Sequence, residues 1–244
     1  MLTVVLPTRN EAAIIRANLE RLLAFLRTNT SEEWCVIVAD NASMDATRAI
    51  VREIATTNPQ VELLEIPKAG KGGAVLAAWQ RALQIPDSRF QIPVFVFMDA
   101  DLATDLAALP SLISAIRNDA DIAVGSRYLP ESRTERGALR RLTSWCYRLL
   151  LRVLFGLRMS DPPCGFKAVN ERVVREIVPL VRDQQWFFDT ELLIRAQRAG
   201  LRITEIPVTW HEPRRRSSIR KITHMIAGDL RAMWQLWREL HNHR

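Results

Sequence analysis

Short apolar segments alternate with longer amphipathic segments along the first half of the chain. The apolar segments are rich in Val, Leu, Ile and Phe, and each precedes a stretch whose apolar residues have helical spacing. We expect strands at 3–6, 35–39, 61–66 and 93–98, and helices at 11–27, 45–57, from 69 onward and at 105–118. Strands separated by crossover helices pair in parallel, so the pattern predicts an α/β fold with a mainly parallel sheet flanked by helices.

The pattern changes after about residue 130. A fifth strand is expected at 122–128, followed by a long helix of mixed apolar and Arg residues at 138–157. A strand at 203–210 and an amphipathic helix at 221–240 complete the chain. We find no internal repeat and no linker-like segment. We therefore expect one domain over 1–244, in which 1–130 binds the ligand and 131–244 is built onto the same sheet.

Carboxylates directly follow three of the expected strands. The segments are PTRNE after the first strand, DNASMDAT after the second and DADLATD after the fourth. Parallel strands direct the loops at their carboxyl ends toward one edge of the sheet, where ligands of α/β proteins bind. The acidic side chains are therefore expected around one crevice.

Asp99 and Asp101 in DADL carry the sharpest chemical signal. Two carboxylates one residue apart at a strand end can hold a hard divalent cation, Mg²⁺ or Mn²⁺, beside a diphosphate. The alternative is that both aspartates only form a turn and cap the next helix. The apolar strand VFVFM leads straight into them, which favours the metal site.

Two other groups of rim residues allow more than one interpretation. Asp40 can accept a hydrogen bond from a nucleobase or ribose, whereas Asp45 and Thr47 can cap the following helix. Glu11 either contacts the ligand or completes a capping box that begins at Thr8. The residues themselves do not decide between these roles.

The segment KAGKGGAV at 68–75 places lysines and glycines at the start of a helix. Free N–H groups and the helix dipole favour an anion there, so we expect Lys71 to contact a phosphate. The segment is not a P-loop, because Glu65 replaces its first glycine and no Ser or Thr follows Lys71. Hydrolysis of nucleoside triphosphates is therefore not predicted.

Three further residues are candidates for the same crevice. Arg127 follows the fifth strand, and Lys167 would reach the crevice if its loop folded back over it. The alternative for Arg127 is an ordinary surface arginine. Asp189 is interpreted first as the cap of the helix that follows, and second as a group that contacts the acceptor.

Positive charge exceeds negative charge by seven, and the excess arginines lie in the second half of the chain. A basic surface predicts phosphates, anionic lipids or nucleic acid as partners. The helices at 138–157 and 221–240 mix Leu and Trp with Arg, which is typical of helices at a membrane interface. Packing in the core, with the arginine heads reaching solvent, is the alternative.

The chain has three cysteines without metal-ligand spacing or CxxC pairs, which indicates a reducing compartment. We find no signal peptide and no apolar stretch near the roughly 18 residues that a membrane span needs. We therefore expect a cytoplasmic protein, peripheral at the inner face of the membrane.

Seven motifs in this order resemble the inverting glycosyltransferase family 2. They are LPTRNEA, VADNASMDAT, AGKGGAV, MDADLATD, AVGSRY, DPPCGFKAVN and WFFDTELLIRAQ, and they extend over nearly the whole chain. The similarity is greatest to the dolichyl-phosphate glucose and mannose synthases. The segments CGFK, WFFDTELL and EIPVTW look most like the glucose branch.

The resemblance implies a GT-A (Rossmann-like) fold and assigns a nucleotide-sugar site. That site carries over onto Pro7, Arg9, Glu11, Val38, Asp40, Asp99, Ala100, Asp101 and Arg127. Asp101 would be the principal metal ligand. A basic loop that closes on the diphosphate maps onto the region from Arg214 to Arg220 and Lys221. Ala103 stands where the mannose synthases often have Gln, which leaves the other metal ligands open. Arg9 stands where an aromatic residue is frequent, which leaves the base-stacking contact open.

The resemblance also implies the reaction: metal-dependent transfer of a hexose, with UDP-glucose as the favoured donor, to a polyprenyl phosphate. A phosphate monoester is largely dianionic at neutral pH and needs no strong general base. Alternatives are mannose transfer from GDP-mannose to the same lipid, transfer to a hydroxyl with Asp189 as the base, and a non-catalytic basic binding module. Nucleic acid is not expected as a partner, since the acidic rim would repel it.

Overall fold

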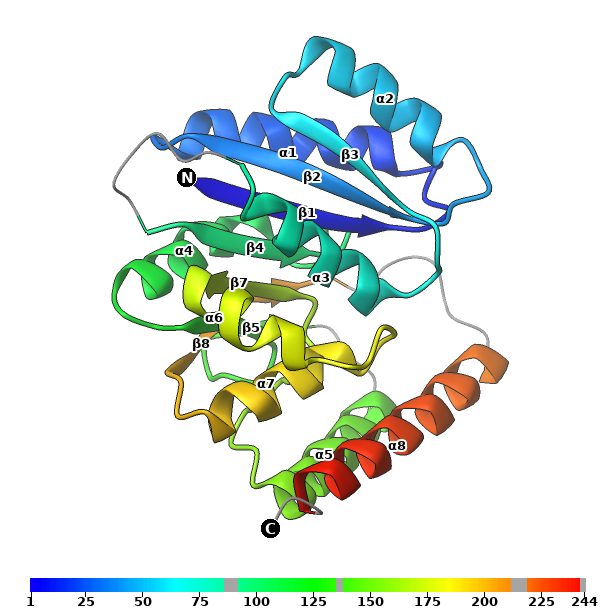
Figure 1. Ribbon diagram of the computed structural model, residues 1–244, viewed down its shortest axis with the longest axis vertical. Helices are drawn as coiled ribbons and strands as arrows, with labels where there is room; N and C mark the ends of the chain where they lie inside the picture. Colours follow the sequence, from blue (N-terminus) through cyan, green and yellow to red (C-terminus); the bar gives the residue numbers. More distant parts are fainter. Residues whose placement is uncertain (86–91, 135–137, 212–218, 242–244) are drawn as a thin grey trace.

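The computed structural model describes residues 1–85, 92–134, 138–211 and 219–241, with side chains described outside 138–142 and 219–227. A seven-stranded sheet in the order β3-β2-β1-β4-β7-β5-β8 forms its centre (Figure 1). The strands are β1 Leu2–Thr8, β2 Trp34–Asn41, β3 Val61–Ile66, β4 Val94–Met98, β5 Ile122–Ser126, β7 Phe166–Asn170 and β8 Ile203–Pro207. All neighbours pair in parallel except β7, which is antiparallel to both β4 and β5. The predicted mainly parallel sheet is confirmed.

The helices occupy the connections between the strands. They are α1 Ile15–Asn29, α2 Thr47–Thr57, α3 Lys71–Ala82, α4 Leu109–Arg117, α5 Ala138–Phe155, α6 Glu171–Glu176, α7 Phe188–Arg198 and α8 Ile219–His241, with short 3-10 turns η1 Leu106–Ala108 and η2 Val178–Leu180. Every residue of β4 and β5 is buried, so both faces of the sheet are covered at its centre. The two longest helices, α5 and α8, lie beyond one end of the sheet, away from α2 and β3 (Figure 1).

The strand β7 is absent from the sequence-based expectation. Its sequence FKAVN places Lys167 in the middle of a buried strand, where the apolar pattern of a central strand does not anticipate a charge. The expectation that Lys167 lies on a loop folded over the crevice is therefore wrong. The structure places the whole side chain inside the sheet, with no exposed surface.

Two predicted boundaries also change. The capping box at Thr8 and Glu11 does not form, because Thr8 is the last residue of β1 and α1 begins only at Ile15. The strand expected over 203–210 is divided into β8 and the short β9 Thr209–Trp210, which pairs with β6 Arg133–Thr134. No helix in the described part of the chain combines the length and apolarity needed to cross a bilayer.

Candidate functional site

The carboxyl ends of β1, β2 and β4 form one polar rim. Parallel pairing sets Thr8 beside Asp40, and Asp99 follows the last residue of β4 directly. Pro7 and Glu11 are half-buried here and Arg9 is exposed, whereas Val38 and Ala100 have buried side chains. The structure thus brings the predicted residues of the three strand ends to one edge of the sheet.

Asp40 is buried, and only one of its carboxylate oxygens is satisfied. Oδ2 accepts a hydrogen bond from the Ser43 amide at 3.1 Å and lies 3.6 Å from Nε of Arg48. Oδ1 of Asp40 and the hydroxyl of neighbouring Thr8 have no hydrogen-bond partner among the described residues. Buried polar atoms are nearly always paired, so these two are suited to a ligand that supplies hydrogen bonds.

The loops after β1 and β2 are tied together by side chains. The amide of Glu11 donates to Oγ1 of Thr47 at 2.9 Å, and the amide of Ala12 donates to Oδ2 of Asp45 at 3.1 Å. Oδ1 of Asp45 accepts from the amide of Thr47, the first residue of α2. Asp45 therefore does more than support the helix start: it holds the two loops of the rim in one arrangement.

The DADL carboxylates have different surroundings. Oδ1 of Asp99 lies 2.6 Å from Nζ of buried Lys71, while Asp101 is exposed and accepts a hydrogen bond from the Ala103 amide at 3.1 Å. Desolvation and the negative charge of Asp99 raise the pKa of Asp101. A Cβ atom on Gly165 would lie 2.1 Å from Oδ2 of Asp99, so only glycine leaves room for this carboxylate.

Behind Asp99, two lysines and one aspartate form a buried charge cluster. Nζ of Lys71 lies 3.8 Å from Asp189, and Nζ of Lys167 lies 2.7 Å from the same carboxylate. Lys167 also donates to the carbonyl oxygens of Pro162 at 2.9 Å and Cys164 at 2.5 Å. Burial opposes the charge of Lys71, but Asp99 and Asp189 outweigh it and raise the pKa of the ammonium.

The predicted helix cap at Asp189 is wrong. Helix α7 begins at Phe188 without a side-chain cap, and the Asp189 carboxylate points to the two lysines instead. Burial raises the pKa of this carboxyl group, and the charges of Lys167 and Lys71 oppose that rise. Sequence spacing gave no sign of this, because the three partners come from α3, β7 and α7.

The glycines of the 68–75 segment do not form an open anion cradle. The amides of Gly72 and Gly73 donate to the carbonyl oxygens of Gln185 at 3.0 Å and Gln184 at 3.1 Å. A Cβ atom on Gly72 would come within 2.6 Å of the Phe188 side chain. These glycines permit close packing of the 183–188 segment on α3, and Lys71 is the part of the motif that faces the rim carboxylates.

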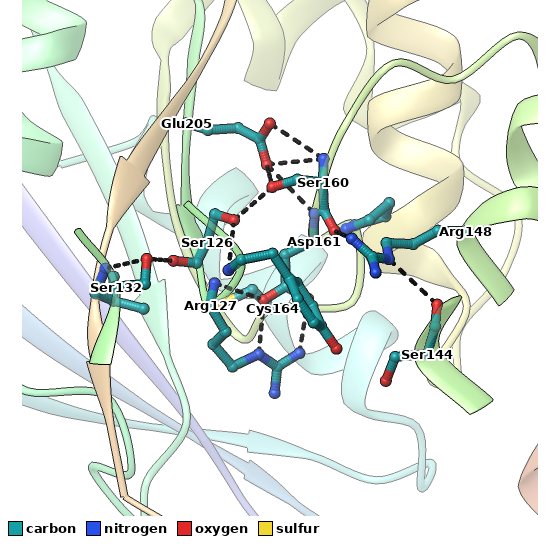
Figure 2. Close-up of polar contacts among 12 residues, drawn as sticks. Ser126, Arg127, Ser132, Ser144, Arg148, Ser160, Asp161, Cys164 and Glu205 are labelled. Atoms are coloured by element: carbon teal, nitrogen blue, oxygen red, sulfur yellow. Dashed lines mark hydrogen bonds and ion pairs between the residues drawn. The ribbon is translucent and has the colours of Figure 1, made fainter. Parts of the chain in front are cut away.

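Arg127 is locked by a residue that sequence reasoning missed. Its Nε and Nη2 donate to Oδ2 and Oδ1 of Asp161 at 2.6 and 2.8 Å, and its backbone amide donates to Oδ2 at 3.0 Å (Figure 2). Burial opposes the charge, but the hydrogen bonds and charge of Asp161 outweigh it and raise the pKa of Arg127. Arg127 is thus no ordinary surface arginine. Asp161 stands in the DPPCGF motif, but spacing alone does not pair it with Arg127.

The segment that carries Asp161 is itself fixed. Ser160 contacts Oγ of Ser126 at 2.5 Å and donates through its amide to Glu205 at 2.9 Å (Figure 2). These contacts join the last residue of β5 and the middle of β8 to the segment between α5 and β7. Arg127 is therefore held in place by the sheet itself.

Two predicted contacts are not tested by this arrangement. Arg214 lies outside the described residues, and Arg220 lies in α8 with its side chain outside them. No group of three or more His, Cys, Asp or Glu that could hold a metal occurs in the described part of the chain.

Comparisons by sequence identify related proteins. The family model described as Glycosyl transferase family 2 matches residues 3–178. Glycosyltransferase AglD of Haloferax volcanii is 35% identical over 243 residues, which cover 96% of this chain and 37% of AglD. Undecaprenyl-phosphate mannosyltransferase of Micrococcus luteus is 31% identical over 85% of this chain and 82% of its own. The dolichyl-phosphate beta-glucosyltransferase of Saccharomyces cerevisiae is 30% identical over 86% of this chain and 67% of its own.

Comparison by structure gives the same architecture. Glucosyl-3-phosphoglycerate synthase from Mycobacterium tuberculosis, crystallised with Mn²⁺, UDP-glucose and phosphoglyceric acid, has a TM-score of 0.72 at 18% identity over 97% of this chain and 79% of its own. Mannosyl-3-phosphoglycerate synthase from Rubrobacter xylanophilus has a TM-score of 0.70 at 17% identity over 98% of this chain and 74% of its own. These similarities show the fold. The ligands of this chain have to be inferred from its own residues.

Proposed function

The chain belongs to glycosyl transferase family 2 and has the GT-A fold, and from this premise we propose that it transfers a hexose from a nucleoside diphosphate sugar to a polyprenyl phosphate. The chain spans 37% of AglD and 64% of the dolichyl-phosphate beta-glucosyltransferase ALG5C of Trichomonas vaginalis, so the proposal rests on its own site as much as on them. The observation that carries it is the rim, where unpaired acceptors on buried residues stand beside a carboxylate pair.

Asp40 is the group that recognises the base of the donor. Its unpaired Oδ1 accepts the ring N–H of uracil, and the Thr8 hydroxyl beside it can bond a carbonyl or ribose oxygen. UDP-glucose is the donor we favour, because the glucosyltransferases are the relatives that the motifs resemble most. The mannosyltransferase relative makes GDP-mannose the second candidate.

The DADL pair is where a divalent ion fits. Asp101 is exposed at the rim, and Asp99, two residues before it, has one oxygen held by Lys71. When bound, Mg²⁺ or Mn²⁺ neutralises charge on the departing diphosphate. Lys71 adds a fixed positive charge at the same place, supported from behind by Asp189.

The reaction is a single displacement. An oxygen of the lipid phosphate attacks the anomeric carbon, the bond from that carbon to the diphosphate breaks, and the configuration inverts. The attacking phosphate is already ionised, so the site does not need a strong base. Arg127, fixed by Asp161, stabilises negative charge at the crevice without having to reorient.

Transfer to a hydroxyl acceptor fits the site less well. It requires a carboxylate that takes a proton, and Asp189 is buried and bonded to Lys167 at 2.7 Å. A purely non-catalytic binding module leaves the carboxylates and the unpaired oxygen of Asp40 without a role. We propose peripheral action at the inner face of the membrane, through α5 and α8.

The test measures release of nucleoside diphosphate from UDP- and GDP-sugars with Mg²⁺ or Mn²⁺, with and without a polyprenyl phosphate. We expect turnover of UDP-glucose that depends on both the ion and the lipid. Turnover that needs a sugar hydroxyl in place of the lipid would move the acceptor to another class. Failure of every donor to bind would reject the proposal.

A further inference from the structure

A hollow of about 430 Å³ lies between α5 and the segment 157–160 that follows it. Three arginines, Arg148, Arg152 and Arg158, line it together with the apolar side chains of Trp145, Leu149 and Met159. None of these residues belongs to the rim that we assign to the donor. The proposed reaction leaves this cluster of charge and apolar surface without a use.

The arginines of the hollow have no carboxylate partner among the described residues. Arg148 donates to the carbonyl oxygens of Ser144 and Ser160, both at 3.3 Å, and its guanidinium lies 4.0 Å from the Tyr128 ring centroid. Arg152 and Arg158 are exposed. Four exposed arginines elsewhere in the described structure, Arg16, Arg52, Arg172 and Arg175, each pair with a glutamate. Three uncompensated guanidinium groups around one hollow favour an anion, and a phosphate in particular.

Exposed apolar side chains also lie on the two long helices. Trp145 is 53% exposed and Leu149 is 45% exposed on α5, close to Val153. On α8, which lies beside α5 (Figure 1), Leu230 and Trp234 are exposed as well. Five of the nine large exposed hydrophobic side chains in the described part of the chain thus lie on these two helices.

The two kinds of surface together select the ligand. A free phosphate would use the arginines but would leave Trp145 and Leu149 in water. A phospholipid uses both, because its headgroup phosphate meets the guanidinium groups while its acyl chains cover the apolar side chains. We propose that the hollow binds the headgroup phosphate of an anionic phospholipid in a bilayer and docks the protein through α5.

This inference depends on the proposed function in one respect: the polyprenyl phosphate acceptor would lie in the same bilayer as the bound phospholipid. One wall of the hollow is Ser160, and the next residue, Asp161, holds Arg127 (Figure 2). A headgroup in the hollow would therefore lie beside Ser160, which directly precedes Asp161, the ion-pair partner of Arg127. Docking through α5 would bring the crevice to the membrane surface, where a polyprenyl phosphate is found.

The experiment measures partitioning of the full chain onto vesicles. Phosphatidylcholine vesicles are compared with vesicles that also contain phosphatidylglycerol, at fixed ionic strength. We expect binding that depends on phosphatidylglycerol and falls about 25-fold in the double variant R152Q/R158Q, since each basic residue near an anionic surface contributes roughly a factor of five. The matched control R21Q/R27Q removes the same charge from α1, where both arginines are exposed and neither pairs with a carboxylate in the described structure. It should change partitioning less than twofold.

The outcomes separate the possible sources. Equal loss in both double variants would overturn the site, because attraction would then depend on net charge alone. Displacement of the protein from vesicles by millimolar inorganic phosphate at constant ionic strength would also overturn it, in favour of a free-phosphate site. W145A should weaken partitioning several-fold with an unchanged circular dichroism spectrum. Full binding by W145A would show that the apolar side chains of the hollow do not contribute to docking. UDP binding measured without vesicles tests the proposed function separately.

Discussion

Charges at the rim are held in pairs, and a ligand must join or replace these pairs. Asp99 faces Lys71, and Arg127 faces Asp161. Asp101 differs, because it is exposed and its carboxylate accepts a hydrogen bond from a backbone amide. Of the two DADL carboxylates, Asp101 is therefore the one free to bind a cation without breaking an ion pair in the described structure.

Asp101→Asn should reduce turnover by about 100-fold or more, because the amide keeps the shape but removes the charge that holds the ion. Mn²⁺ binding, followed by electron paramagnetic resonance, should weaken in parallel while the melting temperature stays within a few degrees. The matched control is Asp119→Asn, at an exposed aspartate away from the rim. Unchanged Mn²⁺ affinity in the Asp101 variant would contradict the assignment.

Gly165→Ala should displace the Asp99 carboxylate, because the new methyl group would lie 2.1 Å from its Oδ2 atom. We expect at least about a tenfold loss of turnover, as misplacing a catalytic group by an ångström commonly costs more than this. Gly228→Ala on α8 is the control, since nothing lies within 4 Å of its added methyl group. Steady-state kinetics of the two folded variants would decide, and equal activity would show that the position of Asp99 is unimportant.

At the scale of elements, β7 joins the site to the core of the protein. It places Lys167 in the middle of the sheet, and Asp189 of α7 and two backbone carbonyls neutralise and bond the ammonium group. The same aspartate supports Lys71 at the rim. A single buried carboxylate thus links the stability of the sheet to the charge of the site.

Lys167→Met should lower the free energy of unfolding by about 3–5 kcal/mol, because it leaves the charge of Asp189 buried with one partner fewer. The double variant K167M/D189N should lose less than the sum of the two single variants, since it removes both charges together. Urea denaturation of all four proteins measures this coupling. Strict additivity of the two changes in unfolding free energy would show that the two side chains do not interact. Lys68→Met, at an exposed lysine, is the control for the loss of a lysine.

Helix α8 contains an aspartate, Asp229, whose ionised form destabilises the folded protein. Burial, together with the negative charges of Asp183 and Asp189, raises the pKa of Asp229 to about 6 from an ordinary 3.8. The unfolded chain therefore loses this proton first as the pH rises, and the protein loses stability between pH 3.8 and 6. Asp229→Asn should stabilise the protein by up to about 3 kcal/mol at pH 7 and have no effect below pH 4. Thermal unfolding across this range checks the sign, and a benefit that grew at low pH would contradict it.

For the whole molecule, the apolar pattern predicted the β1–β4 half well and the second half less well. Four apolar strands with intervening helices follow directly from residue type, and so do the carboxylates at the ends of three of them. The strand β7 was missed because Lys167 interrupts its apolar pattern. The Arg127–Asp161 pair and the Lys71–Asp189 contact were missed because their members are brought together by the fold rather than by spacing.

Donor binding should stabilise the molecule as a whole, because the rim joins elements from both halves of the chain. At a UDP concentration about 100 times its dissociation constant, with Mn²⁺, stability should rise by about 2.7 kcal/mol. For a chain of this size that is roughly 5–10 °C in melting temperature. Calorimetry with UDP, and with CMP as the control, measures the shift in melting temperature. Equal shifts with both nucleotides would contradict specific recognition of uridine diphosphate.

The position of β7 also has a consequence for synthesis. Within the residues that the structure describes, β5 pairs with β7 and β8 alone, and its partner residues in both strands lie more than forty residues further along the chain. While the ribosome extends the chain, β1 to β4 can pair as they emerge, but β5 must wait with both edges open, and β4 waits with one. Unpaired edges invite association between chains. A nascent chain that stalls before residue 166 is therefore the form of this protein most in need of a chaperone.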